Sequence, residues 1–292
     1  MRASDPPPAH PQVLPPLGPL GLRLSVVVTT YNNVHGLKLV LAGLSRQSLP
    51  QFEIVVADDG SGPETARAVE EFAARAPVPV RHLWHHHRGV RKCVILNRAI
   101  TAARGDYLIF FDGDCIPTSE CLARHIRSTQ RGCYLAGGAV FLSRSFSDRL
   151  TVEDVMAGHL DRPGVWWRHV NKRRRLLVSH LPVIPPLMDR RVPRPPSWRG
   201  GNSSAFAQDL HWVGGFDERF TYGFEDADLG HRLQAAGVQG KSIRYTCPVL
   251  HVEHDRPYAD SSDMARSHAL YLENRARRLV WTPNGLPRTE WP

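Results

Sequence analysis

Two aspartates that flank a single glycine, Asp112 and Asp114, directly follow an uninterrupted apolar run over residues 107–111. Such a run is typical of a central strand that is covered on both faces. In an open α/β sheet, the carboxyl ends of the strands form the edge at which ligands bind. Carboxylate oxygens suit Mg²⁺ or Mn²⁺, and these ions commonly join one or two carboxylates to the phosphates of a substrate. The pair therefore predicts a site for a metal ion and a diphosphate.

A second acidic cluster, Glu225, Asp226 and Asp228, begins a predicted helix. Gly223 precedes the cluster, and apolar residues follow it at helical spacing at positions 229, 233 and 236. The helix dipole favours carboxylates in a first turn, which accounts for at least one of the three. A further helix is predicted over residues 258–280.

Strands and helices alternate before the first acidic pair. Strands are predicted over residues 24–30, 53–57, 80–84 and 107–111, and helices over residues 36–47, 63–75 and 91–103. This order predicts a parallel α/β sheet with right-handed crossovers. No glycine-rich dinucleotide fingerprint follows the first strand and no P-loop motif occurs in the sequence, which disfavours both of those nucleotide sites. Three adjacent histidines, His85 to His87, cannot share one face of a helix or strand and are predicted to lie in a loop.

The composition is that of a globular protein. The chain has 292 residues, of which 42% are hydrophobic, so one large domain, or one domain with a subdomain, is expected. No apolar run approaches the length that spans a bilayer. Residues 1–21 are rich in proline and lack the apolar core of a signal peptide, so we expect a disordered leader.

Five cysteines, an odd number without C-x-x-C spacing, indicate neither a zinc site nor a disulfide framework. Together with the missing export signal, they predict a protein of the reducing cytoplasm.

The positive charge is concentrated in one segment. Residues 162–199 contain ten arginines or lysines and a single acid, Asp189, whereas the whole chain has a net charge of +9. The segment also holds three tryptophans and seven prolines, which predicts an irregular insertion rather than a helix. Basic residues interleaved with tryptophan suit an anionic membrane surface, although they would also suit nucleic acid. A solvated loop without a partner is the third interpretation.

Several segments together resemble the inverting glycosyltransferases of family two, which have the GT-A fold and use nucleotide-diphosphate sugars. The matching pieces are VVVTTYNN (26–33), VVADDGS (55–61), the stretch 88–97 and YLIFFDGDC (107–115). Residues 200–233 resemble the acceptor-side motif of the galactosyltransferase-like and chondroitin-polymerase-like members. The resemblance implies a GT-A-type, Rossmann-like mixed sheet, mostly parallel and flanked by helices. It divides the chain into a nucleotide-sugar half (22–116), an acceptor half (117–256) with the basic insertion, and a C-terminal helix and tail (257–292).

The resemblance also assigns the donor site. Thr29 and Tyr31 would lie against the base and ribose, and Asp58, with Asp59 beside it, would accept from the uracil N–H of a UDP-sugar. Arg91 would place positive charge near the diphosphate. The nucleotide-sugar residues are then Thr29, Tyr31, Asp58, Asp59, Arg91, Asn97, Asp112, Gly113, Gly201 and Asn202.

The metal ion, Mn²⁺ or Mg²⁺, would be held by Asp112 and Asp114 and completed by a distal histidine. His251 and His254 both match that histidine, and their spacing does not decide between them.

On the acceptor side, Asp226 matches the general base and Glu225 would bind acceptor hydroxyls. The family often has Trp-Gly before this Glu, whereas Tyr222, Gly223 and Phe224 stand here, so Tyr222 or Phe224 would form the aromatic platform.

The resemblance thus implies a metal-dependent glycosyltransferase that moves a sugar from a nucleotide-diphosphate sugar to a glycan or lipid-linked acceptor, in cell-surface polysaccharide or lipopolysaccharide synthesis. We expect a peripheral enzyme at the inner face of the cytoplasmic membrane. Three alternatives remain: an inactive GT-A scaffold, a basic protein that binds nucleic acid or membrane, and a sugar-nucleotide pyrophosphorylase. The pyrophosphorylase would need a glycine-rich, arginine-containing loop after the first strand, which TTYNN is not. A nucleic-acid partner is not expected, because it would leave the acidic pairs unexplained.

Overall fold

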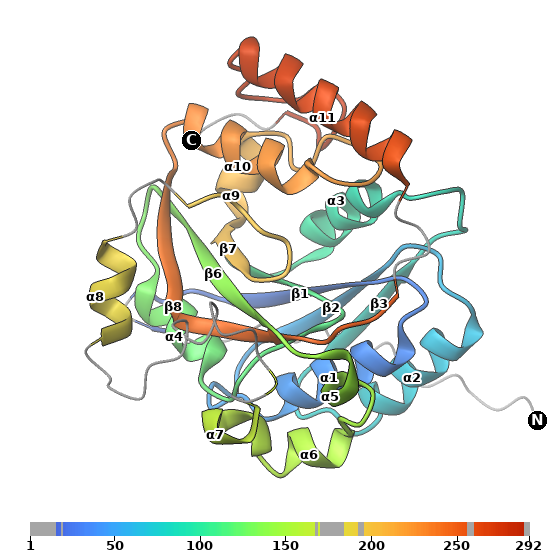
Figure 1. Cartoon of the computed structure of the whole chain (residues 1–292). Coiled ribbons are helices and arrows are strands. Elements are labelled where there is room, and N and C mark those ends of the chain that lie inside the picture. The colour runs from blue at the N-terminus through green and yellow to red at the C-terminus, as the bar shows by residue number, and fades with distance from the viewer. Residues whose placement is uncertain are drawn as a thin grey trace, which may run out of the picture.

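An eight-stranded mixed sheet forms the centre of the molecule in the computed structural model, with the strand order β3-β2-β1-β4-β7-β6-β8-β5 (Figure 1). The structure describes residues 16–18, 20–166, 169, 184–191, 196–255 and 260–288. Most of the predicted leader lies outside these residues. Its last part, however, is packed, because Leu17 and Leu22 form a bridge and are both buried.

The first half of the sheet is parallel, as predicted. Its strands are β1 (Leu24–Thr30), β2 (Glu53–Asp58), β3 (Val80–Trp84) and β4 (Tyr107–Asp112), and each pairs with its neighbour in parallel. The crossover helices are α1 (Val34–Ser45), α2 (Pro63–Ala73) and α3 (Lys92–Ala102). The parallel arrangement brings the polar residues that end β1, β2 and β4 to one edge.

The second half makes the sheet mixed. It contains β5 (Cys115–Ile116), β6 (Cys133–Phe141), β7 (Ser203–Phe206) and β8 (Gln239–His251), with helix α4 (Cys121–Ser128) between β5 and β6. Strand β7 runs antiparallel to both β4 and β6, β8 runs parallel to β6, and β5 runs antiparallel to β8. The short β5 thus joins the end of the first acidic pair to the end of β8.

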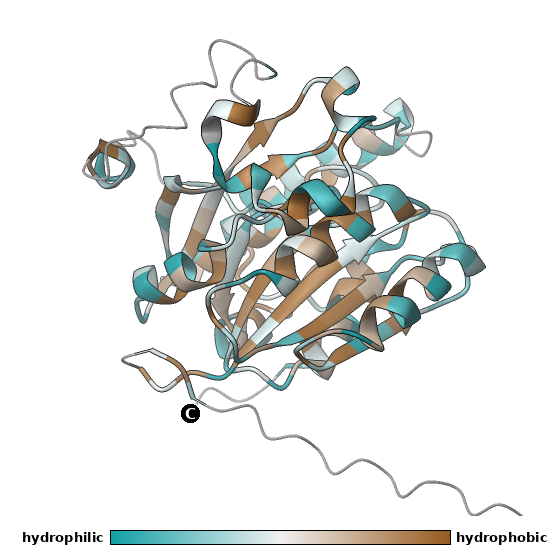
Figure 2. Cartoon of the chain, turned by 90° about the horizontal axis from the view of Figure 1, so that it is seen from below, coloured by the Kyte–Doolittle hydropathy of each residue, from teal (hydrophilic) through white to brown (hydrophobic). Residues whose placement is uncertain are grey.

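Each face of the sheet packs on its own layer of helices, and alternate residues of a strand serve the two layers. Val26 and Val28 join the core that contains α1, whereas Val27 joins the core that contains α3. The second layer also holds α9 (Ala207–Trp212), α10 (Glu225–Ala235) and α11 (Ser261–Ala276), which lie with α3 above the sheet in Figure 1. Coloured by hydropathy, the strands are mainly apolar and the surface helices carry their hydrophilic residues outside (Figure 2). Both faces are covered, as the continuous apolar strands require.

Short helices follow β6. They are α5 (Arg144–Ser147), α6 (Val152–Met156), the 3₁₀ helix η1 (His159–Asp161), α7 (Pro163–Trp166) and α8 (Ile184–Arg190). The prediction of an irregular segment over 162–199 was therefore wrong for α7 and α8, while residues 167–168, 170–183 and 192–195 lie outside the described residues. Proline is tolerated in a first helical turn, where the missing N–H would have no helical partner, and this explains Pro163 in α7. Asp189 fixes α8 to β8 by accepting hydrogen bonds from the backbone of Tyr245 and Thr246 and from the Ser242 hydroxyl. Among the described residues, no helix is long and apolar enough to cross a membrane.

Asn97 differs from its predicted role in donor binding. Its side chain is buried within the second layer, where Nδ2 donates to the carbonyl of Phe216 and to Glu218, and Oδ1 accepts from the Phe216 N–H. Every polar atom of the amide is therefore used to tie α3 to the segment after α9. The donor assignment treated Asn97 as a ligand, but its amide satisfies a buried backbone turn.

Replacing Asn97 by alanine should consequently reduce stability. The substitution leaves a buried N–H and a buried carbonyl of Phe216 without partners, which costs about 1–3 kcal/mol for each group. Thermal or urea unfolding of the Asn97→Ala variant measures this loss. Nucleotide affinity at a temperature where the variant is folded should equal that of the wild type, and a selective loss of nucleotide binding would restore the original assignment.

Candidate active site

A cavity of about 680 Å³ lies at the carboxyl ends of β1, β2 and β4. It is lined from both halves of the chain, and most of the predicted site residues meet there. The predicted site residues that line it are Thr29, Tyr31, Asp59, Asp112, Gly113, Asp114, Tyr222, Phe224, Glu225, Asp226, His251 and His254. The two acidic clusters, which are far apart in the sequence, thus share one cavity.

Asp114 and the two distal histidines form a compact group. Asp114 Oδ2 lies 2.7 Å from His254 Nε2 and 3.4 Å from His251 Nε2. The antiparallel pairing of β5 with β8 sets this approach, since Cys115 is directly opposite His251. Burial would raise the pKa of Asp114, but the hydrogen bond with His254 and the charges of both histidines outweigh it and hold that pKa at about 2. One carboxylate and two imidazoles are a donor set that Mn²⁺ accepts, so these residues fit a divalent ion.

Asp112 interacts with side chains of β1 and α3. Its Oδ1 accepts from the Thr29 hydroxyl at 2.8 Å and lies 3.0 Å from the Lys92 ammonium. Gly201 passes close to it, since a Cβ on that glycine would lie 3.2 Å from Asp112 Oδ2 and 2.9 Å from Cys115 Sγ. The glycine is needed here for its small size, close to the donor-side carboxylate.

Asp226 belongs to the second acidic cluster, in the first turn of α10, and it lines the cavity. Its Oδ2 accepts from the Gly200 N–H at 2.7 Å, whereas its Oδ1 has no hydrogen-bond partner among the described residues. Burial raises the pKa of Asp226 to about 7; Lys92 opposes this rise, and Glu225 and Asp112 add to it. A carboxylate with that pKa and a spare acceptor oxygen can remove a proton near neutral pH.

Lys92 was not predicted, and the structure places it between the two acidic clusters. Its ammonium lies 3.0 Å from Asp112 and 3.6 Å from Glu225. Burial alone would lower the pKa of Lys92, but Asp112, Asp226 and Glu225 together raise it well above the usual value. It therefore stays charged and offsets part of the carboxylate charge.

The family resemblance implied a positive charge at the preceding residue, Arg91. Arg91 is the N-cap residue of α3, and its backbone N–H donates to Asp59 Oδ2 at 2.9 Å. The Arg91 side chain is not among the groups that line the cavity, whereas that of Lys92 is.

On the side predicted to bind the nucleotide, each aspartate pairs with a histidine: His85 of the predicted loop for Asp59, and His82 of β3 for Asp58. Asp59 pairs with His85 at 2.7 Å and lines the cavity. Asp58 is fully buried. Its Oδ1 accepts from the Ser61 N–H and its Oδ2 lies 3.0 Å from His82. Both carboxylate oxygens therefore have protein partners in place of the predicted uracil ring.

Two aromatic rings form a wall of the same region. Tyr31 stacks on His87 with ring centroids 4.8 Å apart and an interplanar angle of 17°. His87 lies in a loop, as predicted from the three adjacent histidines, but no role in the site was predicted for it.

Asn202, like Asn97, is turned away from the predicted donor pocket. It is buried; its Nδ2 donates to the carbonyls of Gly138 and Cys247, and its Oδ1 lies 2.9 Å from His125 Nε2. Asn202 therefore joins β6, β8 and α4 beneath the cavity, and it is a structural residue here rather than a donor ligand.

The wall of the cavity that was predicted to bind the acceptor is aromatic. Phe224 stacks on His268 and Tyr271 of α11, with ring centroids 4.6 and 5.7 Å away, and Met264 of the same helix also lines the cavity. Tyr222 lines the cavity as well, so the structure keeps both predicted platform residues at this wall.

Two models of glycosyltransferase families match the chain. The model of glycosyl transferase family 2 matches residues 25–182, which is more than half of the chain. The model described as the N-terminal domain of galactosyltransferase matches residues 191–255, which include the acidic start of α10 and both distal histidines.

Similar proteins include glycosyltransferases of several kinds. YfnE, an uncharacterized glycosyltransferase of Bacillus subtilis, is 27% identical over 282 residues, covering 86% of this chain and 70% of the relative. Chondroitin synthase of Escherichia coli is 25% identical over 242 residues, covering 75% of this chain and 33% of the synthase. The chain thus spans one third of the length of that synthase.

Two solved structures share the fold. The mannosyltransferase PcManGT of Pyrobaculum calidifontis, in complex with GDP-Man and Mn²⁺, has a TM-score of 0.56 at 17% identity and covers 86% of this chain and 62% of that one. GalNAc-T7 with UDP, GalNAc and Mn²⁺ has a TM-score of 0.60 at 15% identity and covers 86% of this chain and 48% of that one. These likenesses give the sheet its class, the GT-A fold. The matched family model shows that this chain belongs to glycosyl transferase family 2.

Proposed function

We propose that this glycosyltransferase inverts the anomeric centre as it moves a sugar from a UDP-sugar to a hydroxyl group of a glycan or lipid-linked acceptor. The observation that carries the proposal is Asp226. Its carboxylate has a spare acceptor oxygen and a pKa of about 7, and it lines the same cavity as the Asp114–His251–His254 group. A base and a leaving-group site in one cavity are what direct displacement requires.

In this mechanism Asp226 accepts the proton of the acceptor hydroxyl as the new glycosidic bond forms. Glu225 would bind neighbouring hydroxyls of the acceptor, and Phe224 and Tyr222 would support its ring. The positive charge of Lys92 offsets part of the negative charge of the cavity carboxylates and keeps the pKa of Asp226 from rising further. The transferred proton thus stays at Asp226 Oδ1 until the product leaves.

On the donor side, Tyr31 would stack with the base and Thr29 would hold Asp112 in place through its hydroxyl. Asp114, His251 and His254 are the residues that would hold a divalent ion, which would stabilise the charge of the departing diphosphate. Structures that share the fold are complexes with Mn²⁺ and with GDP-Man or UDP. The choice of UDP here rests on the resemblance of the sequence motifs.

We further infer a place at the inner face of the cytoplasmic membrane, in cell-surface polysaccharide or lipopolysaccharide synthesis. Support comes from the ten basic residues of segment 162–199 and from chondroitin synthase among the relatives. Arg190 and Arg191, at the end of α8, belong to the described part of this segment.

The base assignment is tested with Asp226→Asn. Release of nucleoside diphosphate is followed over a panel of UDP- and GDP-sugars with candidate acceptors. We expect kcat/KM to fall by about 10²–10⁴-fold, because a positioned base contributes about that factor. UDP affinity should stay the same, and turnover near the wild-type rate would show that another group is the base.

The pH profile of the wild type adds a second readout. The base must be ionised, so kcat/KM should rise with pH and level off above a midpoint near the pKa of Asp226, about 7. The stability effect has the opposite sign. Because folding raises the pKa of this carboxyl above 3.8, its contribution to stability is complete at low pH and is lost as the pH rises through about 7. Asp226→Asn should therefore melt no lower than the wild type at pH 8, which separates lost catalysis from lost folding.

Lys92 provides an independent test of the electrostatics. Lys92→Met removes the charge that lowers the pKa of Asp226, so the midpoint of the pH profile should shift upward by about 1 pH unit or more. Lys92→Arg keeps the charge and serves as the matched control. An unchanged midpoint in Lys92→Met would mean that Lys92 and the titrating group are not coupled.

The metal site is tested by calorimetry of UDP binding with and without Mn²⁺. Asp114→Ala should remove the Mn²⁺-dependent part of the affinity, a loss of about 10–100-fold. The control is His159→Ala, which breaks the pair of His159 with Asp154 at 3.1 Å on the far surface of α6 and η1. Retention of the full Mn²⁺ effect in Asp114→Ala would place the ion elsewhere.

The membrane proposal predicts salt-sensitive sedimentation of the protein with vesicles that contain anionic lipid. Replacing Arg173, Arg174 and Arg175 together by glutamine should lower the bound fraction several-fold, because each basic residue near such a surface adds about 1 kcal/mol. Equal binding to neutral and anionic vesicles would argue against it.

A further inference from the structure

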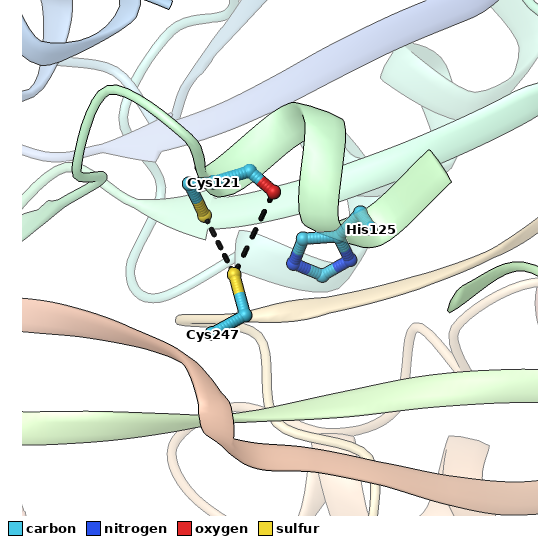
Figure 3. A group of neighbouring side chains, drawn as sticks. All are labelled: Cys121, His125 and Cys247. Atoms are coloured by element: carbon cyan, nitrogen blue, oxygen red, sulfur yellow. Dashed lines mark hydrogen bonds between the residues drawn. The ribbon is translucent and has the colours of Figure 1, made fainter. Parts of the chain in front are cut away.

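Two thiols from distant parts of the chain lie in contact (Figure 3). Cys121 is the first residue of α4 and Cys247 lies in β8, 126 positions later, yet their sulfurs are 3.1 Å apart. Both residues are completely buried, and both thiols are free. We propose that Cys121 and Cys247 form a reversible intramolecular disulfide that fastens α4 to β8 behind the candidate active site.

A metal ion is the other chemistry that this cluster suggests, because His125 lies beside the two sulfurs. The hydrogen bonds of His125 argue against it. Asn202 uses its amide nitrogen for two carbonyls, so its oxygen must accept from His125 Nε2, and the Ser204 hydroxyl lies 2.8 Å from His125 Nδ1. Both ring nitrogens are therefore occupied. Two thiolates on one tetrahedral zinc ion, each about 2.3 Å from it, would also lie farther apart than the 3.1 Å seen here.

The backbone around Cys247 can accommodate the short movement that a bond needs. A disulfide requires a sulfur separation of about 2.05 Å, so the thiols must approach by about 1 Å. The register of β6 against β8 jumps from Ile243 to Pro248, which leaves residues 244–247 outside the ladder. Cys247 belongs to this bulge, where no hydrogen bond of the β6–β8 ladder opposes a shift.

The surroundings also shift the pKa values of the two thiols in opposite directions. The hydrogen bond between the two thiols and the nearby His125 lower the pKa of the Cys247 thiol, whereas burial raises the pKa of Cys121. Cys247 is then the better nucleophile, since the thiolate is the reactive form.

The oxidation balances with a peroxide as the oxidant. The Cys247 thiolate attacks one oxygen of hydrogen peroxide, which gives a sulfenic acid and, after protonation of the leaving hydroxide, water. The Cys121 sulfur then attacks the sulfenic sulfur, loses its proton and releases a second water as the S–S bond forms. The two thiols lose two electrons and two protons in total, and the peroxide is reduced to two waters.

The position of the bond gives it a consequence for the site. Cys247 precedes His251 by four residues on β8, and β5, which follows Asp114, leads into the helix that Cys121 begins. Asn202 accepts from His125 and donates to the carbonyl of Cys247, so the same network reaches the loop that carries Gly200 and Gly201. A covalent link here would hold both strands that bring Asp114 and His251 together.

The experiment uses the full chain. It is treated with hydrogen peroxide, remaining thiols are blocked with maleimide in denaturant, and the digest is analysed by mass spectrometry without reduction. We expect a peptide pair joined through Cys121 and Cys247 that separates on reduction with dithiothreitol. Closing a loop of this length typically stabilises by a few kcal/mol, so the oxidised protein should melt about 5–10 °C higher, reversibly.

The controls use the other sulfur groups of the chain. Cys133→Ser, at a half-buried thiol outside the cluster, should keep both the linked peptide and the shift in melting temperature. Cys121→Ser and Cys247→Ser should lose both. Met156, which is 50% exposed, should become a sulfoxide in every sample and so confirm that the oxidant acted.

Two results would overturn the proposal. One is recovery of Cys121 and Cys247 as maleimide adducts from a wild-type sample in which Met156 is oxidised. The other is purified protein that contains one equivalent of zinc, measured by elemental analysis and lost in both serine variants, which would make the cluster a metal site instead.

Discussion

The candidate active site depends on one short backbone contact, the pairing of β5 with β8. Strand β5 has only two residues, and their partners on β8 are His251 and Leu250. A further hydrogen bond, from the Val252 N–H to the Asp114 carbonyl, continues the pairing. It brings Asp114 to His254 across 140 positions of sequence. The group that would hold a metal ion is therefore positioned by the sheet itself. A change that separates β5 from β8 would move Asp114 away from the histidines while leaving the parallel half of the sheet intact.

The same cavity gives two aspartates opposite electrostatic environments. Asp114 faces two imidazoles, which keep its pKa at about 2, whereas burial raises the pKa of Asp226 to about 7. Titratable groups whose pKa values are pushed apart in one cavity are typical of sites that divide roles between an acid–base group and a charged ligand. Lys92 connects the two environments, because its ammonium lies between Asp112 and Glu225. Its charge limits the repulsion between carboxylates that would otherwise oppose folding.

The sequence was sufficient for features that are determined locally. Strands 24–30 and 80–84 have the predicted bounds. The first of them is an almost continuous run of apolar and β-branched residues, which specifies a strand without tertiary help. The sequence was insufficient where the role of a side chain depends on residues that are distant in sequence but close in space. Asn97 and Asn202 lie in the expected motifs, yet their amides satisfy buried carbonyls, and no local pattern separates such an asparagine from a ligand. The choice between Arg91 and Lys92 depends on the residue at which α3 begins, which is the least certain part of a predicted helix. The approach of Cys121 to Cys247 depends on a bulge that spacing does not reveal.

The orientation of Asp226 depends on a costly turn that the C-terminal helix supports. Gly223 and Phe224 both have positive φ, 83° and 63°, and for a bulky side chain such as Phe224 the left-handed region costs about 1–2 kcal/mol. The stacking of Phe224 on His268 and Tyr271 compensates for part of this cost. Helix α11 also holds α10, since Asn274 donates to Asp228 within the buried Asp228–Arg232 pair. Asp226, the aromatic wall and the support of the turn therefore belong to one packed unit. Since Met264 of α11 lines the cavity beside Phe224, the C-terminal helix contributes directly to the surface that an acceptor would meet.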